Sequence, residues 1–186
     1  NSFNKKMDYQ ANYGSAGPQA LYGIIQGGIY EDLRDESIEF NINSKHFFGL
    51  AIGGSLGSSK KEMYNVVKYT ASKLKSSHPI HLLGIGDPSD IWELVTYGID
   101  TFDCVSPTRL ARHGAALSRN IKGKINIKNS KYRDSLEPID KKCLCTTCKN
   151  YTLSYLHHLF KSEELLVLNL ITNHNIYYMN NLMNYI

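Results

Sequence analysis

Long apolar segments are missing from this sequence of 186 residues. No window approaches the roughly 18 consecutive apolar residues that a membrane-spanning helix needs. The opening NSFNKKMDYQ is polar and lacks the apolar core of a secretory signal peptide. Proline is scarce at 5 residues, and charged residues make up 20% of the chain against 42% hydrophobic residues, which argues against collagen, disorder and coiled coil. We therefore expect a folded globular protein of the cytoplasm with no membrane attachment.

Acidic residues are absent between Arg109 and Arg133, although the net charge of the whole chain is only +4. So small an excess does not indicate a nucleic-acid partner, because many enzymes with simple substrates carry as much. The clustered basic residues are Arg109, Arg112, Arg119, Lys122, Lys124, Lys128, Lys131 and Arg133. Such a run is ordinarily a solvated surface, and binding of a phosphate backbone is the alternative.

Short β-rich runs alternate with helical patterns through the first hundred residues. The runs cover residues 21–28, 48–54, 80–86 and 101–105. Each reads as a strand buried on both faces. Helical patterns cover residues 30–40, 60–74 and 89–97. The first carries apolar Leu33, Ile38 and Phe40, and the last is opened by Pro88 and capped by Ser89. The alternation predicts right-handed βαβ crossovers and a parallel sheet.

Polar and glycine residues stand at the carboxyl ends of the predicted strands, where open α/β sheets and (β/α)8 barrels carry their sites. They are Gln26, Gly53, Gly54 and Asp103. Four βα units are half of a barrel, and 186 residues with a non-repeating tail cannot close one, because a whole barrel takes about 250 residues. After Pro107 the pattern predicts a hairpin over 115–118 and 124–128 and helices over 151–160, 163–171 and 173–185.

Three cysteines lie within six residues, at Cys143, Cys145 and Cys148. In a chain without a secretory signal this spacing indicates a metal rather than disulfides, and three thiolates in one tight loop suit tetrahedral Zn2+. The fourth ligand would come from downstream, and the candidates are His157, His158 and His174. Adjacent histidines on a helix point about 100° apart, so at most one of the first two could bind. Four protein ligands would make a structural site.

Asp103 lies inside a buried-strand pattern, where a carboxylate loses several kcal/mol of solvation unless something compensates for it. Arg109 and Arg112 follow closely enough to do so. One interpretation is a structural ion pair, and the other is a nucleophile or base beside an arginine pair that binds an anion. The neighbouring Cys104 reads as a small core residue.

Several motifs occur together and in order: YGIIQGG at 22–28, AIGG at 51–54, LGIG at 83–86, FDCVSPTRLARHG at 102–114, and the cysteine cluster followed by His174-Asn175. From about Ala20 to the last residue the chain closely resembles the queuine tRNA-ribosyltransferases, the tRNA-guanine transglycosylases, in their bacterial form. The resemblance implies a (β/α)8 barrel with a zinc subdomain. It also implies exchange of guanine at the anticodon wobble position of tRNA for a 7-deazaguanine base.

The resemblance also implies a role for individual residues. Asp103 falls on the nucleophile, which attacks C1′ of the wobble ribose and holds a covalent tRNA intermediate. Gln26 and Gly54 fall on positions that hydrogen-bond the base, with Gly53 keeping the turn open. Leu83 would pack on the base. His174 matches the fourth ligand of one structural zinc ion.

Two segments match those that contact tRNA in the family. They are Gly84, Ile85, Gly86, Asp87, Pro88, Ser89 and Asp90, and Thr108, Arg109, Leu110, Ala111 and Arg112. Phosphate contacts would position the anticodon loop while the pocket reads the flipped-out base. The implied partners are a tRNA with guanine at the wobble position and 7-aminomethyl-7-deazaguanine, which the bacterial pattern favours over queuine. A homodimer is a further expectation.

The resemblance divides the chain into three parts. Residues 1–19 are an unmatched or poorly ordered start, residues 20–135 the carboxyl-terminal half of the barrel, and residues 136–186 the zinc-binding subdomain with terminal helices. The chain opens with Asn1 rather than Met, so we expect it to be cut from something longer.

Departures from the family pattern limit the expected activity. Where relatives often read GGLAVGE, residues 53–58 are one residue shorter and lack the Glu, and Asp87 stands where Lys is frequent. The family's general base lies in the first half of the barrel, and nothing before Ala20 matches it, so the chain alone should be inactive. The alternatives are a non-catalytic, zinc-containing tRNA-binding subunit or fragment, and a degenerate gene fragment. The buried carboxylate favours the enzyme.

Overall fold

The computed structural model describes residues 11–12, 18–44, 47–54, 56–74, 78–119 and 123–186. The chain divides into two compact units, Asn1–Cys104 and Val105–Ile186. The two units meet between residues 104 and 105, whereas the expected boundary between the barrel half and the zinc-binding subdomain lies between residues 135 and 136. That family-based boundary stays a prediction. Most of residues 1–19 lie outside the described part of the chain. Of those that are described, Ala11–Asn12 (β1) pairs antiparallel with Pro18–Gln19 (β2).

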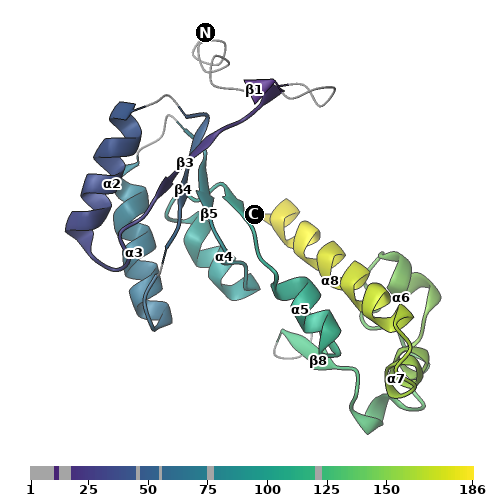
Figure 1. Ribbon diagram of the computed structural model, residues 1–186. Helices are drawn as coiled ribbons and strands as arrows, with labels where there is room; N and C mark the ends of the chain where they lie inside the picture. Colours follow the sequence, from purple (N-terminus) through teal and green to yellow (C-terminus); the bar gives the residue numbers. More distant parts are fainter. Residues whose placement is uncertain (1–10, 13–17, 45–46, 55, 75–77, 120–122) are drawn as a thin grey trace. The chain divides into compact units, whose positions relative to one another are not determined.

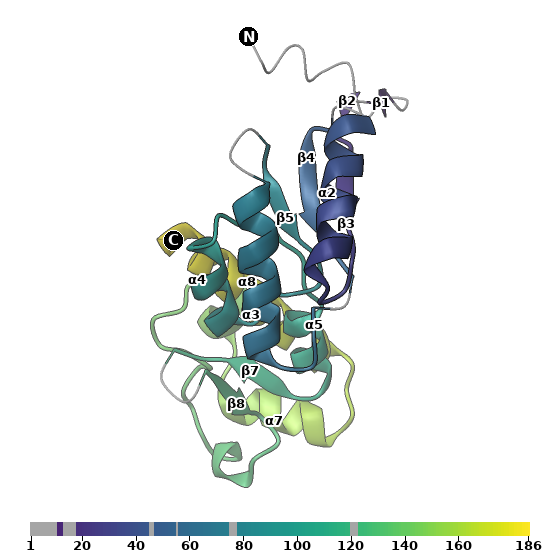
Figure 2. The same cartoon turned by 90° about the vertical axis from the view of Figure 1, so that its left-hand side faces the viewer.

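Four parallel strands, each adjacent to the next in the sequence, form the sheet of the first unit (Figure 1). They are β3 (Tyr22–Ile25), β4 (Gly49–Ile52), β5 (Ile80–Leu82) and β6 (Thr101–Phe102). The helices that follow the first three are α2 (Glu31–Ser44), α3 (Lys60–Lys73) and α4 (Pro88–Val95). Figure 2 shows α3 between α2 and α4. The predicted alternation and the parallel sheet are confirmed.

The ends of the helices follow from local side-chain chemistry. Ser59 caps α3 by accepting from the backbone N–H of Glu62, 3.2 Å away, as a Ser three residues before a Glu commonly does. For α4 the predicted cap Ser89 is wrong, because Asp87 is the capping residue and accepts from the backbone N–H of Ser89. Pro88 then occupies the first turn, where its missing N–H costs nothing.

Burial on both strand faces is observed for only part of the sheet. Every residue of β4 is buried, whereas on β3 Ile24 retains 45% of its surface exposed. In α2 the predicted apolar positions Leu33 and Phe40 are exposed, and the buried face carries Arg34, Ile38 and Asn41 instead. Strand periodicity identifies the strands, but neighbouring layers decide which of their faces are covered.

The second unit is helical around a short hairpin. Its elements are α5 (Ser106–Arg112), β7 (Ala115–Leu117), β8 (Lys124–Asn126), the 3-10 helix η3 (Ser130–Tyr132), α6 (Thr146–Asn150), α7 (Leu153–Lys161) and α8 (Leu166–Tyr185). Strands β7 and β8 pair antiparallel, which confirms the predicted hairpin. The prediction of two helices over 163–171 and 173–185 is wrong, because α8 runs through unbroken. Neither Gly nor Pro interrupts it, and packing overrides the weak propensity of Thr172 and Asn173.

The core of the second unit joins α8 to the hairpin and to α5. Ala111, Ile127, Leu156 and Ile171 are fully buried in it. Among the described residues, no helix is both long and apolar enough to cross a membrane.

Candidate functional site

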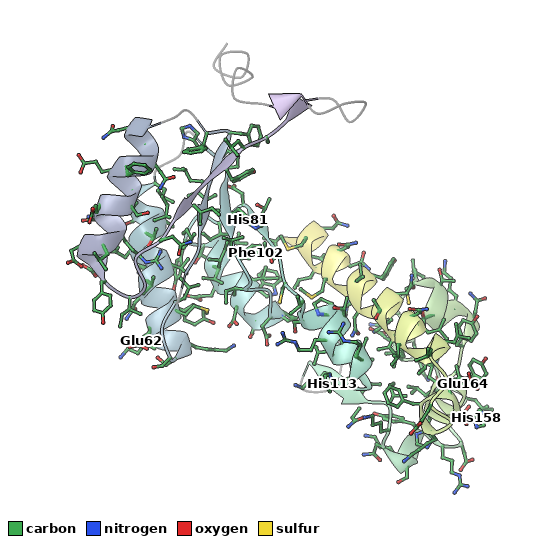
Figure 3. The ribbon with its side chains drawn as sticks, viewed as in Figure 1. Glu62, His81, Phe102, His113, His158 and Glu164 are labelled. Carbon is green, nitrogen blue, oxygen red and sulfur yellow. The ribbon has the colours of Figure 1, made fainter. Side chains whose placement is uncertain are left out.

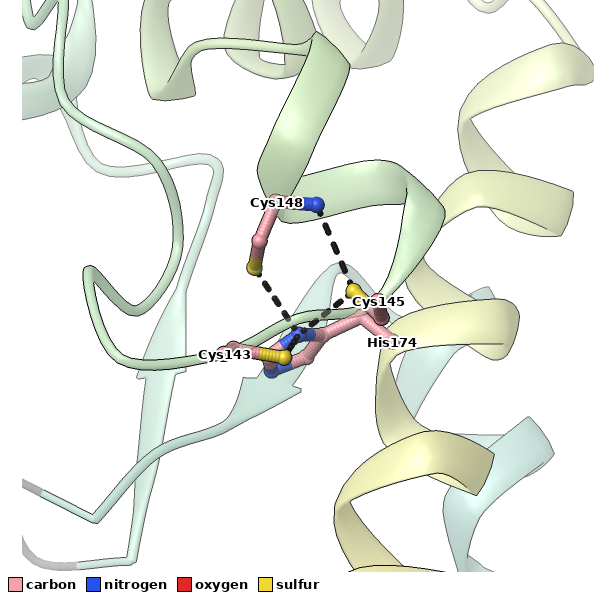
Figure 4. Close-up of side chains that lie close together, drawn as sticks. All are labelled: Cys143, Cys145, Cys148 and His174. Carbon is pink, nitrogen blue, oxygen red and sulfur yellow. Dashed lines mark hydrogen bonds between the residues drawn. The ribbon is translucent and has the colours of Figure 1, made fainter.

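The predicted metal ligands come together in the second unit (Figure 4). Nδ1 of His174 lies 3.6 Å from Sγ of both Cys143 and Cys145 and 3.2 Å from Sγ of Cys148. Zn–S and Zn–N bonds of about 2.3 and 2.0 Å in a tetrahedron would separate S and N by about 3.5 Å. The four ligand atoms lie within 4.8 Å of one another, so these residues fit a tetrahedral zinc ion.

A backbone contact orients the ligand imidazole. Nε2 of the fully buried His174 lies 2.8 Å from the carbonyl oxygen of Leu117 on β7. Because a carbonyl only accepts, Nε2 carries the proton and Nδ1 keeps its lone pair for a metal. Of the three candidate histidines, the structure therefore places His174 with the three cysteines. His157 is a core residue bonded to the carbonyl of Ile127 at 2.8 Å, and His158 is exposed.

The three thiols perturb one another strongly. The pKa of Cys145 is lowered to about 3, chiefly because its sulfur accepts a hydrogen bond from the side chain of Cys148. The same contact raises the pKa of Cys148, and burial raises the pKa of Cys143. A divalent ion at the centre of the cluster would displace the thiol protons, because coordinated thiols are deprotonated.

Asp103 lies directly beyond the end of β6, in the first unit. Its Oδ1 accepts from the backbone N–H of Gly84 at 3.0 Å and lies 3.1 Å from Nε2 of His81. Figure 3 shows His81 beside Phe102, on the neighbouring strand. The expected burial of Asp103 is wrong: 57% of its side chain is exposed, because β6 is only two residues long and ends before it. Within its own unit the carboxylate is compensated by these two donors.

The predicted base-binding residues converge at the carboxyl ends of β3, β4 and β5. A Cβ placed on Gly54, whose φ is +82°, would lie 2.6 Å from Oε1 of Gln26. A Cβ on Gly53 would lie 3.0 Å from Cδ1 of Leu83. The positive φ favours glycine at position 54, whereas a side chain at position 53 would require its neighbours to shift by a few tenths of an ångström. Gly54, Leu83 and Gly84 also line an open cleft of about 410 Å³.

A buried arginine, which the sequence did not single out, supports these turns. Arg34 on α2 is 1% exposed and donates to the carbonyls of Gly28 at 2.8 Å and Gly53 at 3.1 Å. Its burial lowers the pKa of the guanidinium. The available indication was helical spacing, because Arg34 shares a face with Ile38 and Asn41.

The departure from the family loop has a structural counterpart. Oε2 of Glu62 accepts from the backbone N–H of Ser58 at 2.8 Å and from its hydroxyl at 2.9 Å. These bonds, led by the backbone one, lower the pKa of Glu62. The carboxylate of Glu62 thus bonds to the loop residue that precedes the amino end of α3.

The predicted tRNA-contacting segment 84–90 includes one buried side chain. Asp90 is 5% exposed, and its Oδ1 lies 2.6 Å from both Nζ of Lys60 and the hydroxyl of Tyr64. The contact raises the pKa of Lys60, and that of Tyr64 to about 12. We assign this side chain to packing between α3 and α4. Gly84, Asp87 and Ser89 of the segment are exposed.

The basic run lies on the surface of the second unit. Its described members are all exposed: Arg109, Arg112, Arg119, Lys124, Lys128, Lys131 and Arg133. Within the described residues, none of them forms an ion pair with a carboxylate. Arg109 and Arg112 project from α5, while Ala111 between them is buried. Lys122 lies outside the described residues.

Fold and site together define an α/β protein with a polar site at the carboxyl ends of its parallel strands and a separate three-cysteine, one-histidine metal site. The family model for queuine tRNA-ribosyltransferase matches residues 4–186, beginning earlier than Ala20. The chain is 48% identical over 167 residues to the queuine tRNA-ribosyltransferases of Roseiflexus sp. (strain RS-1) and Francisella tularensis subsp. novicida (strain U112). The chain therefore belongs to the queuine tRNA-ribosyltransferase family. Each alignment covers 89% of this chain but only 42% and 45% of the two relatives.

Proposed function

We propose that this chain is the carboxyl-terminal part of a tRNA-guanine transglycosylase, which exchanges guanine at the wobble position for a 7-deazaguanine base in cytoplasmic tRNA. The observation that carries the proposal is the position of Asp103, at the same sheet edge as the turn formed by Gln26, Gly53 and Gly54. We assign the flat ring of the base to this edge, because nucleophilic base exchange requires a carboxylate next to the base.

In the first half of the reaction, a lone pair of an Asp103 oxygen forms a bond to C1′ of the ribose. The C1′–N9 bond breaks, and its electron pair leaves with guanine, which takes up a proton from an acid. In the second half, the incoming base loses its N9 proton to a base, and its electron pair forms the new N9–C1′ bond. The C1′–O bond breaks, and its electron pair returns to Asp103.

Base recognition is assigned to the turns at the ends of β3, β4 and β5. The amide of Gln26 offers a donor and an acceptor, and Gly54 lets the backbone approach a ring closely. Leu83 supplies an apolar surface in the adjoining cleft. By the resemblance, the incoming base is 7-aminomethyl-7-deazaguanine.

Binding of tRNA is assigned to the exposed arginines of α5, Arg109 and Arg112, and to the exposed part of segment 84–90. Guanidinium groups without a carboxylate partner suit phosphate oxygens. Such contacts would position the anticodon loop while the pocket reads the base.

Zinc, when bound by Cys143, Cys145, Cys148 and His174, would supply folding stability without a reactive coordination position. His174 and its neighbour Asn175 both bond to Leu117, and Asn175 also donates to the carbonyl of Pro107 at 2.9 Å. Binding of the metal would thereby stabilise α5, which carries the two arginines.

The parallel strands β3 to β6 are proposed to be four strands of a (β/α)8 barrel. The exposure of Ile24 at 45% is consistent with a face that further strands would cover. The resemblance places the general base in the first half of that barrel. We therefore propose that base exchange requires that half in addition to this chain.

A non-catalytic tRNA-binding subunit is the second candidate. The shortened loop at residues 53–58 favours it, since Ser58 of this loop donates hydrogen bonds to Glu62 on α3. Incorporation of labelled guanine into tRNA by the complete natural protein that contains this chain distinguishes the two. An enzyme incorporates the label, and the Asp103→Asn variant does not. Tight binding of tRNA with no incorporation by the wild-type protein would support the binding subunit instead.

A further inference from the structure

His81 occupies the one position on β5 that faces the residue proposed as nucleophile. It pairs with Thr101 in the register of β5 and β6, and Asp103 follows directly after β6. The imidazole lies between them, with Nδ1 2.9 Å from the hydroxyl of Thr101 and Nε2 3.1 Å from Oδ1 of Asp103.

The two neighbours decide how the imidazole is protonated. An ionised carboxylate only accepts hydrogen bonds, so Nε2 must carry a proton in this contact. The hydroxyl of Thr101 can then donate to Nδ1, which is 2.9 Å away. The side chain of His81 is 22% exposed and its ring packs edge-on to Tyr22 at 6.2 Å, so its orientation is restrained on a second side.

Both donors to Asp103 converge on a single oxygen. The backbone N–H of Gly84 and Nε2 of His81 both reach Oδ1. Because Oδ1 is held by two donors, we assign Oδ2 as the oxygen that attacks C1′. In an ester at C1′, Oδ2 would be the bridging oxygen and Oδ1 the carbonyl oxygen.

We propose that His81 is a positioning residue that orients Asp103 through Oδ1 and assists release of the covalent intermediate. The inference rests on the proposed function. When the incoming base attacks C1′, the C1′–Oδ2 bond breaks and its electron pair spreads over both carboxylate oxygens. A hydrogen bond to a carboxylate oxygen is stronger than one to an ester carbonyl. His81 therefore stabilises the departing carboxylate more than the intermediate that precedes it.

The test compares His81→Phe with His81→Gln in the complete natural protein that contains this chain. Phe keeps a flat ring beside Tyr22 but has no donor, whereas the amide nitrogen of Gln can replace Nε2–H. The denaturant-resistant tRNA adduct is formed first, and its breakdown on adding excess guanine is then timed. We expect His81→Phe to slow breakdown about tenfold or more and to raise the adduct fraction at steady state. His81→Gln should restore most of the rate, and the Kd for tRNA should change less than about twofold, since His81 is placed against Asp103 and not against phosphate.

Equal breakdown rates in wild type and His81→Phe would overturn the inference while leaving the proposed function intact. Equal slowing in His81→Phe and His81→Gln would also overturn it, because a structural role of the ring would then suffice. Absence of any adduct in the wild type would instead refute the proposed function.

If His81→Phe fails to fold, 15N NMR of the wild-type imidazole tests the contact between His81 and Asp103. Protonated Nε2 whose shift moves in Asp103→Ala supports it, and an unresponsive ring contradicts it.

Discussion

Nε2 of His174 lies 2.8 Å from the carbonyl oxygen of Leu117, and this single contact directs the other ring nitrogen toward three cysteine sulfurs. A helix and a hairpin strand are thereby tied to the same metal site. The relationship makes the histidine assignment testable, because the two other candidates have different surroundings.

Zinc content should depend on His174 and not on its competitors. His174→Ala and Cys145→Ser should lose most of the metal and unfold at lower temperature, since structural zinc contributes directly to folding. His158→Ala, an exposed position, is the matched control and should keep one zinc per chain. Metal analysis of the purified proteins measures this. Full zinc in His174→Ala would contradict the assignment.

Asn175 should be a determinant of the stability of the second unit. Its side chain accepts from the backbone N–H of Leu117 and donates to the carbonyls of Pro107 and Ala115, and the residue is fully buried. Asn175→Ala removes three hydrogen bonds to backbone groups, two of them buried, so we expect a loss of about 2–4 kcal/mol in the free energy of unfolding. The exposed Asn180→Ala should change it by less than about 0.5 kcal/mol in denaturant titrations. Similar losses in both variants would refute this role.

Arg109 and Arg112 should contribute to the salt dependence of tRNA binding. Each phosphate contact releases counterions, so Arg109→Ala or Arg112→Ala should reduce the slope of log K against log salt by about 0.7–0.9. The exposed Lys161→Ala serves as the control and should leave the slope unchanged. Filter binding at several salt concentrations gives the slopes. Unchanged slopes in both arginine variants would make α5 an ordinary solvated surface.

The stability of the first unit should fall in alkali through Tyr64. Its hydrogen bond to Asp90 raises the pKa to about 12, whereas an unfolded tyrosine titrates near 10. Between these values the unfolded state binds fewer protons than the folded state, so stability decreases as pH rises from about 10 to 12. Tyr64→Phe should remove part of this decrease. An identical pH dependence in denaturant titrations of the two proteins would contradict the prediction.

Sequence patterns predicted the alternating layers well because periodicity and turn residues are local properties. They failed where the outcome depends on neighbouring layers or on exact strand length. Asp103 reads as buried in a five-residue strand, yet β6 ends after two residues and leaves the carboxylate half exposed. Helix α8 continues through Asn173 because packing outweighs its weak propensity.

The sequence predicted the candidate site where a pattern of residues has one common role, as closely spaced cysteines have in binding zinc. The cysteine spacing indicated zinc by itself, but the choice of His174 required the resemblance, because spacing alone could not exclude His157. Arg34 and His81 were missed because each is a single polar residue within an otherwise ordinary element. Their significance lies in the groups that they contact, the carbonyls of Gly28 and Gly53 and the carboxylate of Asp103.

The most direct test of the account is to locate the covalent bond to tRNA. The complete natural protein that contains this chain is mixed with an anticodon stem-loop carrying guanine at the wobble position, denatured, digested and analysed by mass spectrometry. We predict a nucleotide attached through its ribose to the peptide that contains Asp103. We also predict no adduct in Asp103→Asn, which should keep its zinc and its affinity for tRNA. An adduct on another residue, or one that persists in Asp103→Asn, would contradict the assignment of Asp103 as the nucleophile.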